Sequence, residues 1–166
     1  MQKMSVRSKP TIANLLKQEK EDILHFSLQS ALPPGHTLAL NTTFGTLAYL
    51  VSEGDTPRLL LQEQFTSTEM SVLMPLLEMF PYYCPYEVMY ASFYNGNTAE
   101  KTVNRCRERL QEALEADVWD QEIRPIRGAL SRARLKLRRF GIDISSILAT
   151  GYILMLGEPL EPISIM

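Results

Sequence analysis

The chain has 166 residues, which fits one domain on the usual scale of roughly 100 to 200 residues per domain. Its 45% hydrophobic and 22% charged residues are typical of a globular protein and argue against a disordered or collagen-like chain. No apolar run approaches the ~18 residues of a membrane-spanning helix. The N-terminus has no apolar stretch after its first basic residues, so no signal peptide is expected. The composition therefore predicts a cytoplasmic protein with no membrane partner.

Residues that could form a metal or catalytic site are few. Cys84, Cys106, His25 and His36 are the only cysteines and histidines, and all four would have to converge to hold one zinc ion. The sequence has no nucleophile-elbow, P-loop or dinucleotide-binding motif. We therefore expect no metal, no cofactor and no enzymatic activity.

Charge is distributed unevenly along the chain, whose net charge is -2. Residues 124–139 contain seven basic and no acidic side chains, a charge of +7, whereas the remainder carries 10 basic and 19 acidic residues, a charge of -9. A concentrated basic element in an acidic body is typical of a protein that presents one face to a polyanion.

One helix and three strands are expected in the N-terminal part. Residues 11–31 carry apolar side chains at loose helical spacing and predict an amphipathic helix that ends before Pro33. This helix could pack on its own sheet or serve as the contact of a homodimer. Alternating patterns then predict short antiparallel strands at 36–41, 46–51 and 58–65.

Three further helices are expected before the basic segment. Thr66 and Glu69 form a capping-box pattern at the start of the first, and Pro75 predicts a kink or break inside it. A short second helix is expected over 85–93, and a third begins at a Thr98 cap. The aromatic residues around the second helix could stack on single-stranded bases or contribute to the core and to partner contacts.

The basic segment predicts a helix that begins at Pro125 and ends before Gly141. Its apolar residues recur every three or four positions from Ile123 to Phe140 and form one continuous seam. The arginines lie opposite this seam. Such a helix suits the DNA major groove, where arginine can bond guanine in a bidentate manner. A β-hairpin with its turn at 149–151 is expected directly after the helix.

The order of these elements resembles the OmpR/PhoB-type winged helix-turn-helix domain. The residues that carry the resemblance are Thr66 and Glu69 in the first helix, 85–88 in the second, 130–137 in the basic helix and 150–152 in the hairpin. The resemblance implies an α+β fold with an N-terminal antiparallel sheet, a recognition helix and a C-terminal β-hairpin wing.

The same resemblance divides the chain into three parts. Residues 1–36 would form an N-terminal tail and the amphipathic helix, 37–156 the winged-helix domain, and 157–166 a C-terminal tail. Residues 97–120 would be an inserted helix, in a connection that can touch RNA polymerase in this family.

A sequence-specific duplex DNA-binding transcription regulator is the function that the resemblance implies, with the helix over 125–139 in the major groove. The family's DNA-contacting positions fall near Arg127, Ser131, Arg132 and Arg134 of this sequence. Leu148 stands where the wing of the family carries an arginine, which argues against a wing contact to the minor groove. Together with the charge of the segment, the resemblance selects these DNA-binding candidates: Arg124, Arg127, Ser131, Arg132, Arg134, Lys136, Arg138, Arg139 and Thr150.

A protein-interaction module is the alternative, since basic amphipathic helices also dock acidic partners, here for example part of the transcription machinery. The DNA hypothesis sets two conditions. The arginines must not be neutralised by carboxylates of the same molecule, and residues 97–120 must leave the basic helix room to enter a groove.

Overall fold

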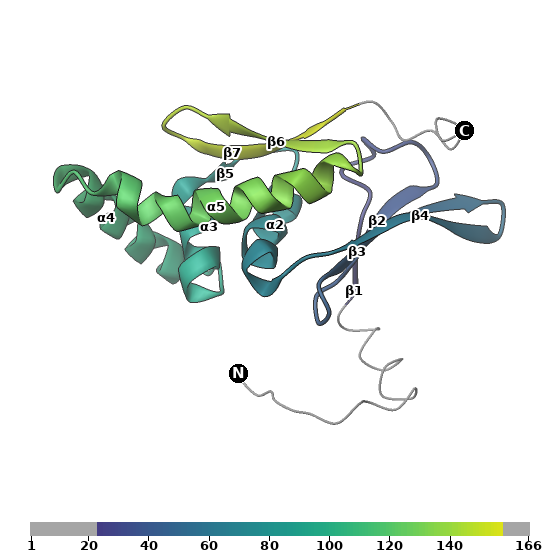
Figure 1. Ribbon diagram of the computed structural model, residues 1–166, viewed down its shortest axis with the longest axis horizontal. Coiled ribbons are helices and arrows are strands. Elements are labelled where there is room, and N and C mark those ends of the chain that lie inside the picture. Colours follow the sequence, from purple (N-terminus) through teal and green to yellow (C-terminus); the bar gives the residue numbers. More distant parts are fainter. Residues whose placement is uncertain (1–22, 158–166) are drawn as a thin grey trace, which may run out of the picture.

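Two antiparallel sheets and a group of helices make up the computed structural model, which describes residues 23–157 (Figure 1). The first sheet has the strand order β1-β2-β3-β4, and its strands are β1 (Ile23–Phe26), β2 (His36–Asn41), β3 (Thr46–Glu53) and β4 (Thr56–Gln64). The second sheet has the order β5-β7-β6, and its strands are β5 (Cys84–Pro85), β6 (Ile142–Ile147) and β7 (Gly151–Leu156).

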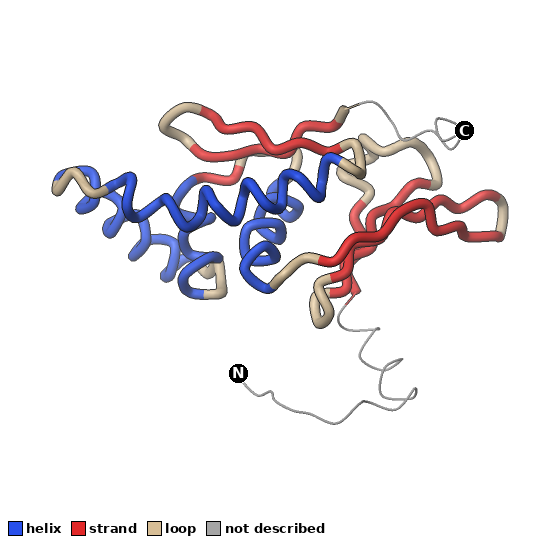
Figure 2. Tube along the Cα trace, in the orientation of Figure 1, coloured by secondary structure: helices blue, strands red, loops and turns tan. Residues whose placement is uncertain are grey.

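The helices lie in the chain between β4 and β6, and Figure 2 shows them in blue beside the red strands of both sheets. They are α2 (Ser67–Met79), α3 (Tyr86–Tyr90) with the π-helical turn η1 (Ala91–Asn95), α4 (Glu100–Glu115) and α5 (Trp119–Arg138). The expected mixed α+β class is confirmed. Within residues 23–157, none of the helices combines the length and apolarity needed to span a bilayer.

The N-terminal prediction is wrong where the structure describes it. Residues 23–26 form strand β1 instead of a helix, and β1 pairs with β2 so that Phe26 lies opposite Leu38. Leu28, Gln29 and Ser30 then have φ between 52° and 66°, a left-handed backbone that cannot continue a right-handed helix. The spacing of apolar residues over 23–31 therefore reflects sheet pairing and a turn. Residues 11–22 of the expected helix, and with them the homodimer contact, lie outside the described residues.

The start of α2 follows the sequence pattern closely. The Thr66 hydroxyl accepts the Glu69 N–H at 3.1 Å, and the Glu69 carboxylate accepts the Thr66 N–H at 3.0 Å, which completes the predicted capping box. α2 continues through Pro75 as one helix, so the alternative of two separate pieces is wrong. The predicted Thr98 cap is also wrong, because Ala99 occupies the N-cap of α4 and makes no side-chain capping bond.

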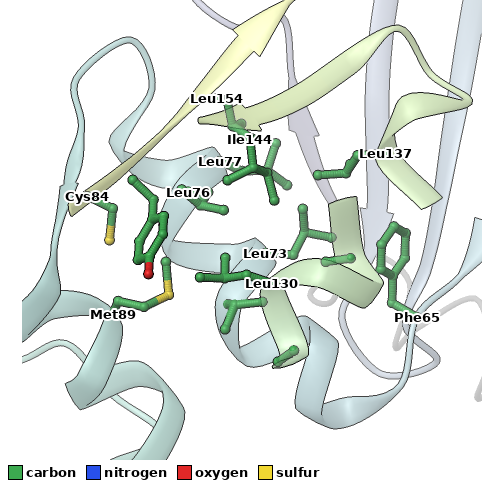
Figure 3. Packing of buried hydrophobic residues seen from close by; sticks show 14 of the residues in the cluster. Phe65, Leu73, Leu76, Leu77, Cys84, Met89, Leu130, Leu137, Ile144 and Leu154 are labelled. Atoms are coloured by element: carbon green, nitrogen blue, oxygen red, sulfur yellow. The ribbon is translucent and has the colours of Figure 1, made fainter. Parts of the chain in front are cut away.

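The hydrophobic core joins both sheets to the helices. Buried residues run as one cluster from Leu38 and Leu47 in the first sheet to Ile144 and Leu154 in the second. Figure 3 shows the middle of this cluster, where Leu73 of α2 and Leu130 of α5 lie between Phe65 and Met89. Because α5 contributes a complete apolar side to this core, its position relative to the second sheet is determined by packing.

Candidate nucleic-acid interface

The apolar seam of the basic helix is buried as its spacing predicts. Ile123, Ile126, Ala133 and Leu137 are each at most 1% exposed, and Leu130 is 5% exposed. These positions recur at intervals of three or four residues, so they lie on one side of α5 and leave the other side to solvent.

The helix is longer than its sequence signals indicate. It begins at Trp119, so Pro125 lies inside α5 and not at its first turn. The Trp119 ring packs edge-on against Tyr86 with the ring centroids 5.0 Å apart, and Asp120 and Glu122 lie in the first turn, where carboxylates interact well with the helix dipole. Tertiary packing and charge extend the helix past a residue that usually marks its start.

The solvent-facing side of α5, its outer line, is not covered by other parts of the described chain. Arg124, Ser131, Leu135 and Arg138 are separated by seven, four and three positions, which places them on one face, and all four are exposed. Gly128 lies between them, and a methyl group there would meet only the Arg132 guanidinium, at 3.5 Å. Close packing of a neighbouring helix therefore does not explain this glycine. Helix α4, the expected insertion over 97–120, leaves this line uncovered, so the second condition of the DNA hypothesis is met.

Asp143 holds two of the basic side chains at the C-terminal half of α5. Its carboxylate accepts bonds from Arg134 Nε at 2.5 Å and Arg134 Nη2 at 3.3 Å, and Arg138 Nε lies 3.5 Å away. The bond from Arg134 is the main reason that the pKa of Asp143 falls to about 2. Arg134, Arg138 and Asp143 are all partly exposed, so solvent screens these pairs.

Asp120 holds Arg127 in a similar way near the other end of the helix. Arg127 Nη2 donates to Asp120 Oδ1 at 2.8 Å. The bond from Arg127 lowers the pKa of Asp120, and both side chains are exposed.

Among the carboxylates that pair with the basic residues of α5, Glu69 is the buried one. Its side chain is 3% exposed and accepts a bond from Lys136 Nζ at 2.7 Å, while Arg132 Nε lies 3.6 Å away. Lys136 also donates to the backbone oxygen of Gln64 at 2.8 Å and lies 5.3 Å from the centre of the Phe65 ring. Removing Lys136 would leave a buried carboxylate short of a partner, so Lys136 holds α5 against α2.

The first condition of the DNA hypothesis fails for most of the basic residues. Arg139 pairs with Glu63 on β4, and with the pairs above six of the seven cations of 124–139 have an intramolecular carboxylate partner. Among the described residues only Arg124 of this set has no ion pair. Four carboxylates serve the six cations, so the local charge is +3 and not the +7 of the segment alone.

A pocket of about 320 Å³ lies between α5 and the hairpin of β6 and β7. Three predicted site residues line it, namely Arg127, Ser131 and Arg134. Its other lining residues are Tyr86, Leu130, Ile144, Ser146 and Tyr152. Burial raises the pKa of the Tyr152 hydroxyl, and the Tyr86 and Tyr152 rings meet edge-on with centroids 5.5 Å apart.

Thr150 is placed differently from the arginines. Its hydroxyl donates to the Leu148 oxygen at 3.0 Å, and its own carbonyl accepts the Tyr86 N–H at 3.2 Å, so it stabilises the hairpin turn. Leu148 itself is 93% exposed at this turn.

Several residues of this region were not among the site residues predicted from the sequence. Ser146, Tyr86 and Tyr152 complete the pocket, and Asp120 and Asp143 hold its arginines. The spacing of seven residues between Asp120 and Arg127 would have indicated one helical face if the helix had been predicted to begin at Trp119.

The aromatic residues around α3 contribute mainly to packing. Tyr90 donates its hydroxyl to Glu122 at 2.6 Å, and burial together with this bond raises the pKa of Tyr90 to about 12. Tyr94 donates to the backbone oxygen of Glu122 at 3.1 Å. These rings join α3 and η1 to α5, in agreement with the core alternative, whereas Tyr82 is 73% exposed.

Residues 23–157 contain no cluster of histidine, cysteine, aspartate and glutamate side chains that could hold a metal ion.

No protein-family model, curated protein or solved structure matches this chain. The resemblance to the OmpR/PhoB-type domain therefore rests on the sequence pattern.

Proposed function

We propose that this protein binds duplex DNA as a transcription regulator of the winged helix-turn-helix type, with α5 in the major groove. The observation that carries the proposal is the open outer line of α5, which runs from Arg124 to Arg138 with the β6–β7 hairpin beside the helix (Figure 1). An α-helix fits the major groove only if one side of it is uncovered along several turns.

The order of elements supports the same proposal. A four-stranded antiparallel sheet is followed by the capped helix α2, the short helix α3, and then α5 with its hairpin. This is the order that the OmpR/PhoB resemblance implies. Helix α4 occupies the expected insertion, and its exposed residues offer a surface for RNA polymerase or another transcription protein.

The intramolecular ion pairs reduce the number of basic residues that can bind DNA, but several arginines can still exchange their carboxylate for a phosphate. An exposed ion pair contributes up to about 1 kcal/mol, so a DNA phosphate can replace an exposed carboxylate at small cost. This applies to Arg127, Arg134 and Arg138. It does not apply to Lys136, whose partner is buried, so we assign this lysine to the positioning of α5.

The test is duplex binding by a variant in which Arg127 and Arg134 are both replaced by alanine. A charge-assisted hydrogen bond is worth about 1.5–3 kcal/mol, so we expect affinity to fall by roughly tenfold to a hundredfold or more. The slope of log K against log salt should become shallower by about 0.9 for each phosphate that the variant no longer neutralises. Arg132 is left unchanged because it contacts the buried Glu69.

Replacement of both Arg105 and Arg107 by alanine is the matched control for this experiment. These are exposed arginines of α4, and Arg107 pairs with Glu87 at 3.2 Å, so the control removes the same two charges from another surface. Circular dichroism would check that all variants fold. Unchanged affinity and salt slope in the double variant would refute the assignment.

Leu135 favours a second candidate function. This side chain is 65% exposed in the last turn of α5, between Ser131 and Arg138 of the outer line, where an apolar contact would suit a protein partner. In that case α5 would dock an acidic protein. A pull-down that nuclease treatment leaves unchanged and that Leu135→Gln abolishes, with no mobility shift on any duplex, would favour this alternative.

A further inference from the structure

We propose that the pocket between α5 and the β6–β7 hairpin seats one phosphate of the DNA backbone, and that Asp120 and Asp143 compete with this phosphate for its two arginines. The inference rests on the proposed DNA-binding function. It adds that the competition between these carboxylates and the phosphate sets the affinity for DNA. In the free protein the two carboxylates hold the arginines beside the pocket, and DNA binding transfers the guanidinium groups from carboxylate to phosphate.

The polar groups of the pocket suit a tetrahedral oxyanion. Arg127 and Arg134 lie four residues before and three residues after Ser131, so all three side chains share one side of α5. Ser146 reaches the same pocket from β6. Neither serine hydroxyl has a hydrogen-bond partner within residues 23–157. Two guanidinium groups and two free hydroxyl donors match the bonds that protein side chains make to backbone phosphates.

The remaining walls of the pocket are largely apolar. Leu130 and Ile144 are both 5% exposed, and Tyr152 is 8% exposed. Apolar walls lower the local dielectric and therefore strengthen the attraction between a phosphate and the arginines.

The two carboxylates differ from the other partners of the basic helix. Asp120 and Asp143 do not line the pocket but pair with its two arginines, and they are 72% and 42% exposed, whereas the Glu69 side chain is 3% exposed. Water can solvate an exposed carboxylate after its arginine leaves, but it cannot reach a buried one. Exchange with DNA is therefore open to Arg127 and Arg134, and the carboxylates act as built-in competitors.

The first experiment measures the competition. The full chain and its Asp120→Asn, Asp143→Asn and doubly substituted variants are titrated with a short fluorescein-labelled duplex of mixed sequence, and anisotropy is followed. We expect each single change to tighten binding about twofold to fivefold, because Asp120→Asn removes one exposed ion pair and Asp143→Asn removes two, to Arg134 and Arg138. The native Asp143 carboxylate accepts the Ile144 N–H at 2.8 Å, and the amide oxygen introduced by Asp143→Asn can accept the same bond, so the local turn should be kept.

Asp55→Asn is the matched control for these variants. Asp55 lies in the turn between β3 and β4, outside the pocket, and its replacement changes the net charge by the same amount. Tightening in Asp55→Asn equal to that in the other variants would show an effect of net charge alone and would overturn the proposal.

The second experiment places a negative charge inside the pocket. Ser146→Glu should weaken duplex binding at least about tenfold, because its carboxylate would occupy the phosphate position. Ser145→Glu is the control, since adjacent residues of a strand point to opposite faces and Ser145 does not line the pocket. Equal weakening by both substitutions would contradict the pocket assignment.

The outcomes separate the two proposals. If neither the wild-type chain nor the doubly substituted variant binds the duplex, the DNA-binding function itself is wrong. If the wild-type chain binds but the pocket variants behave like their controls, the function stands and the pocket is not the phosphate site. Inorganic phosphate is a parallel probe, followed by the NMR signal of the Ser146 amide. A response to inorganic phosphate without duplex binding would identify a free phosphate as the ligand and overturn the inference.

Discussion

Glu69 illustrates how much one side chain contributes to this molecule. It completes the capping box of α2 and at the same time binds Lys136 and approaches Arg132 of α5. Burial raises the pKa of Glu69, but the bonds from Lys136 and from the Thr66 N–H and the charges of Lys136 and Arg132 outweigh that effect and hold the pKa below its usual value. The charged form is therefore the stabilising one at neutral pH.

Glu69→Gln should lower the free energy of unfolding by about 1–3 kcal/mol. Glutamine keeps an oxygen for the Thr66 N–H but removes the charge that holds the two cations. Because the pKa of Glu69 is lowered in the folded state, its contribution is present above the pKa of the unfolded chain, near about 4.3, and is lost as pH falls. The variant should thus also be less sensitive to acid.

Urea denaturation at neutral and acidic pH would measure both effects. Glu63→Gln is the control, because it removes a pair with the exposed Arg139 and should cost less than about 1 kcal/mol. An equal loss of unfolding free energy in the two variants would show that the burial of Glu69 does not add to its effect on stability.

At the scale of elements, the second sheet depends on a close approach between two backbones. Gly151 at the start of β7 lies opposite Pro85 of β5, and a Cβ atom at Gly151 would lie 2.1 Å from the Cys84 carbonyl oxygen. The backbone atoms of the short strand β5 cannot move aside as a flexible side chain could. The glycine of the wing pattern is explained here by this contact and not by a positive φ.

Gly151→Ala should therefore destabilise the protein by about 1–3 kcal/mol, as expected for an overpacked site. It should also weaken duplex binding, since the hairpin carries one wall of the pocket. Thermal denaturation followed by circular dichroism would measure the first effect.

Gly128→Ala provides the contrast. An added methyl group there meets nothing closer than 3.5 Å, and alanine is favoured over glycine in a helix by about 1 kcal/mol, so this variant should be more stable than the wild type. If both alanine variants were destabilised alike, steric contact would not be the reason for Gly151.

The whole molecule is tied together by its core and by the contacts of α5. Buried residues form one cluster across both sheets, and Lys136 and Arg139 connect α5 to Gln64 and Glu63 at the end of β4. The first sheet and the helices with the second sheet are thus parts of one packed unit.

We expect residues 23–157 to unfold cooperatively. Native-state hydrogen exchange should give the same free energy of opening for the amides of Leu38 in β2 and Leu130 in α5, because both residues belong to the common core. A markedly lower value for Leu38 would show that the first sheet opens separately.

Local patterns predicted most of the elements correctly. Alternation identified β2, β3 and β4, the Thr66 and Glu69 pair located the start of α2, and the turn at 149–151 located the hairpin. Prediction failed where a local signal was ambiguous. The apolar spacing over 23–31 suited a helix, but pairing with β2 selected a strand, and Pro125 suggested a helix start that the packing of Trp119 moved six residues earlier.

The sequence by itself determined the basic helix, its buried seam and the hairpin that follows it, because periodicity and turn residues act within a few positions of the chain. Only the tertiary structure decided how much of the positive charge remains unpaired. Lys136 meets Glu69 across 67 residues and Arg139 meets Glu63 across 76, and no local pattern contains such pairs. Ion pairing depends on which segments folding brings together, and here it leaves Arg124, with the exchangeable Arg127, Arg134 and Arg138, as the cations most available to a polyanion.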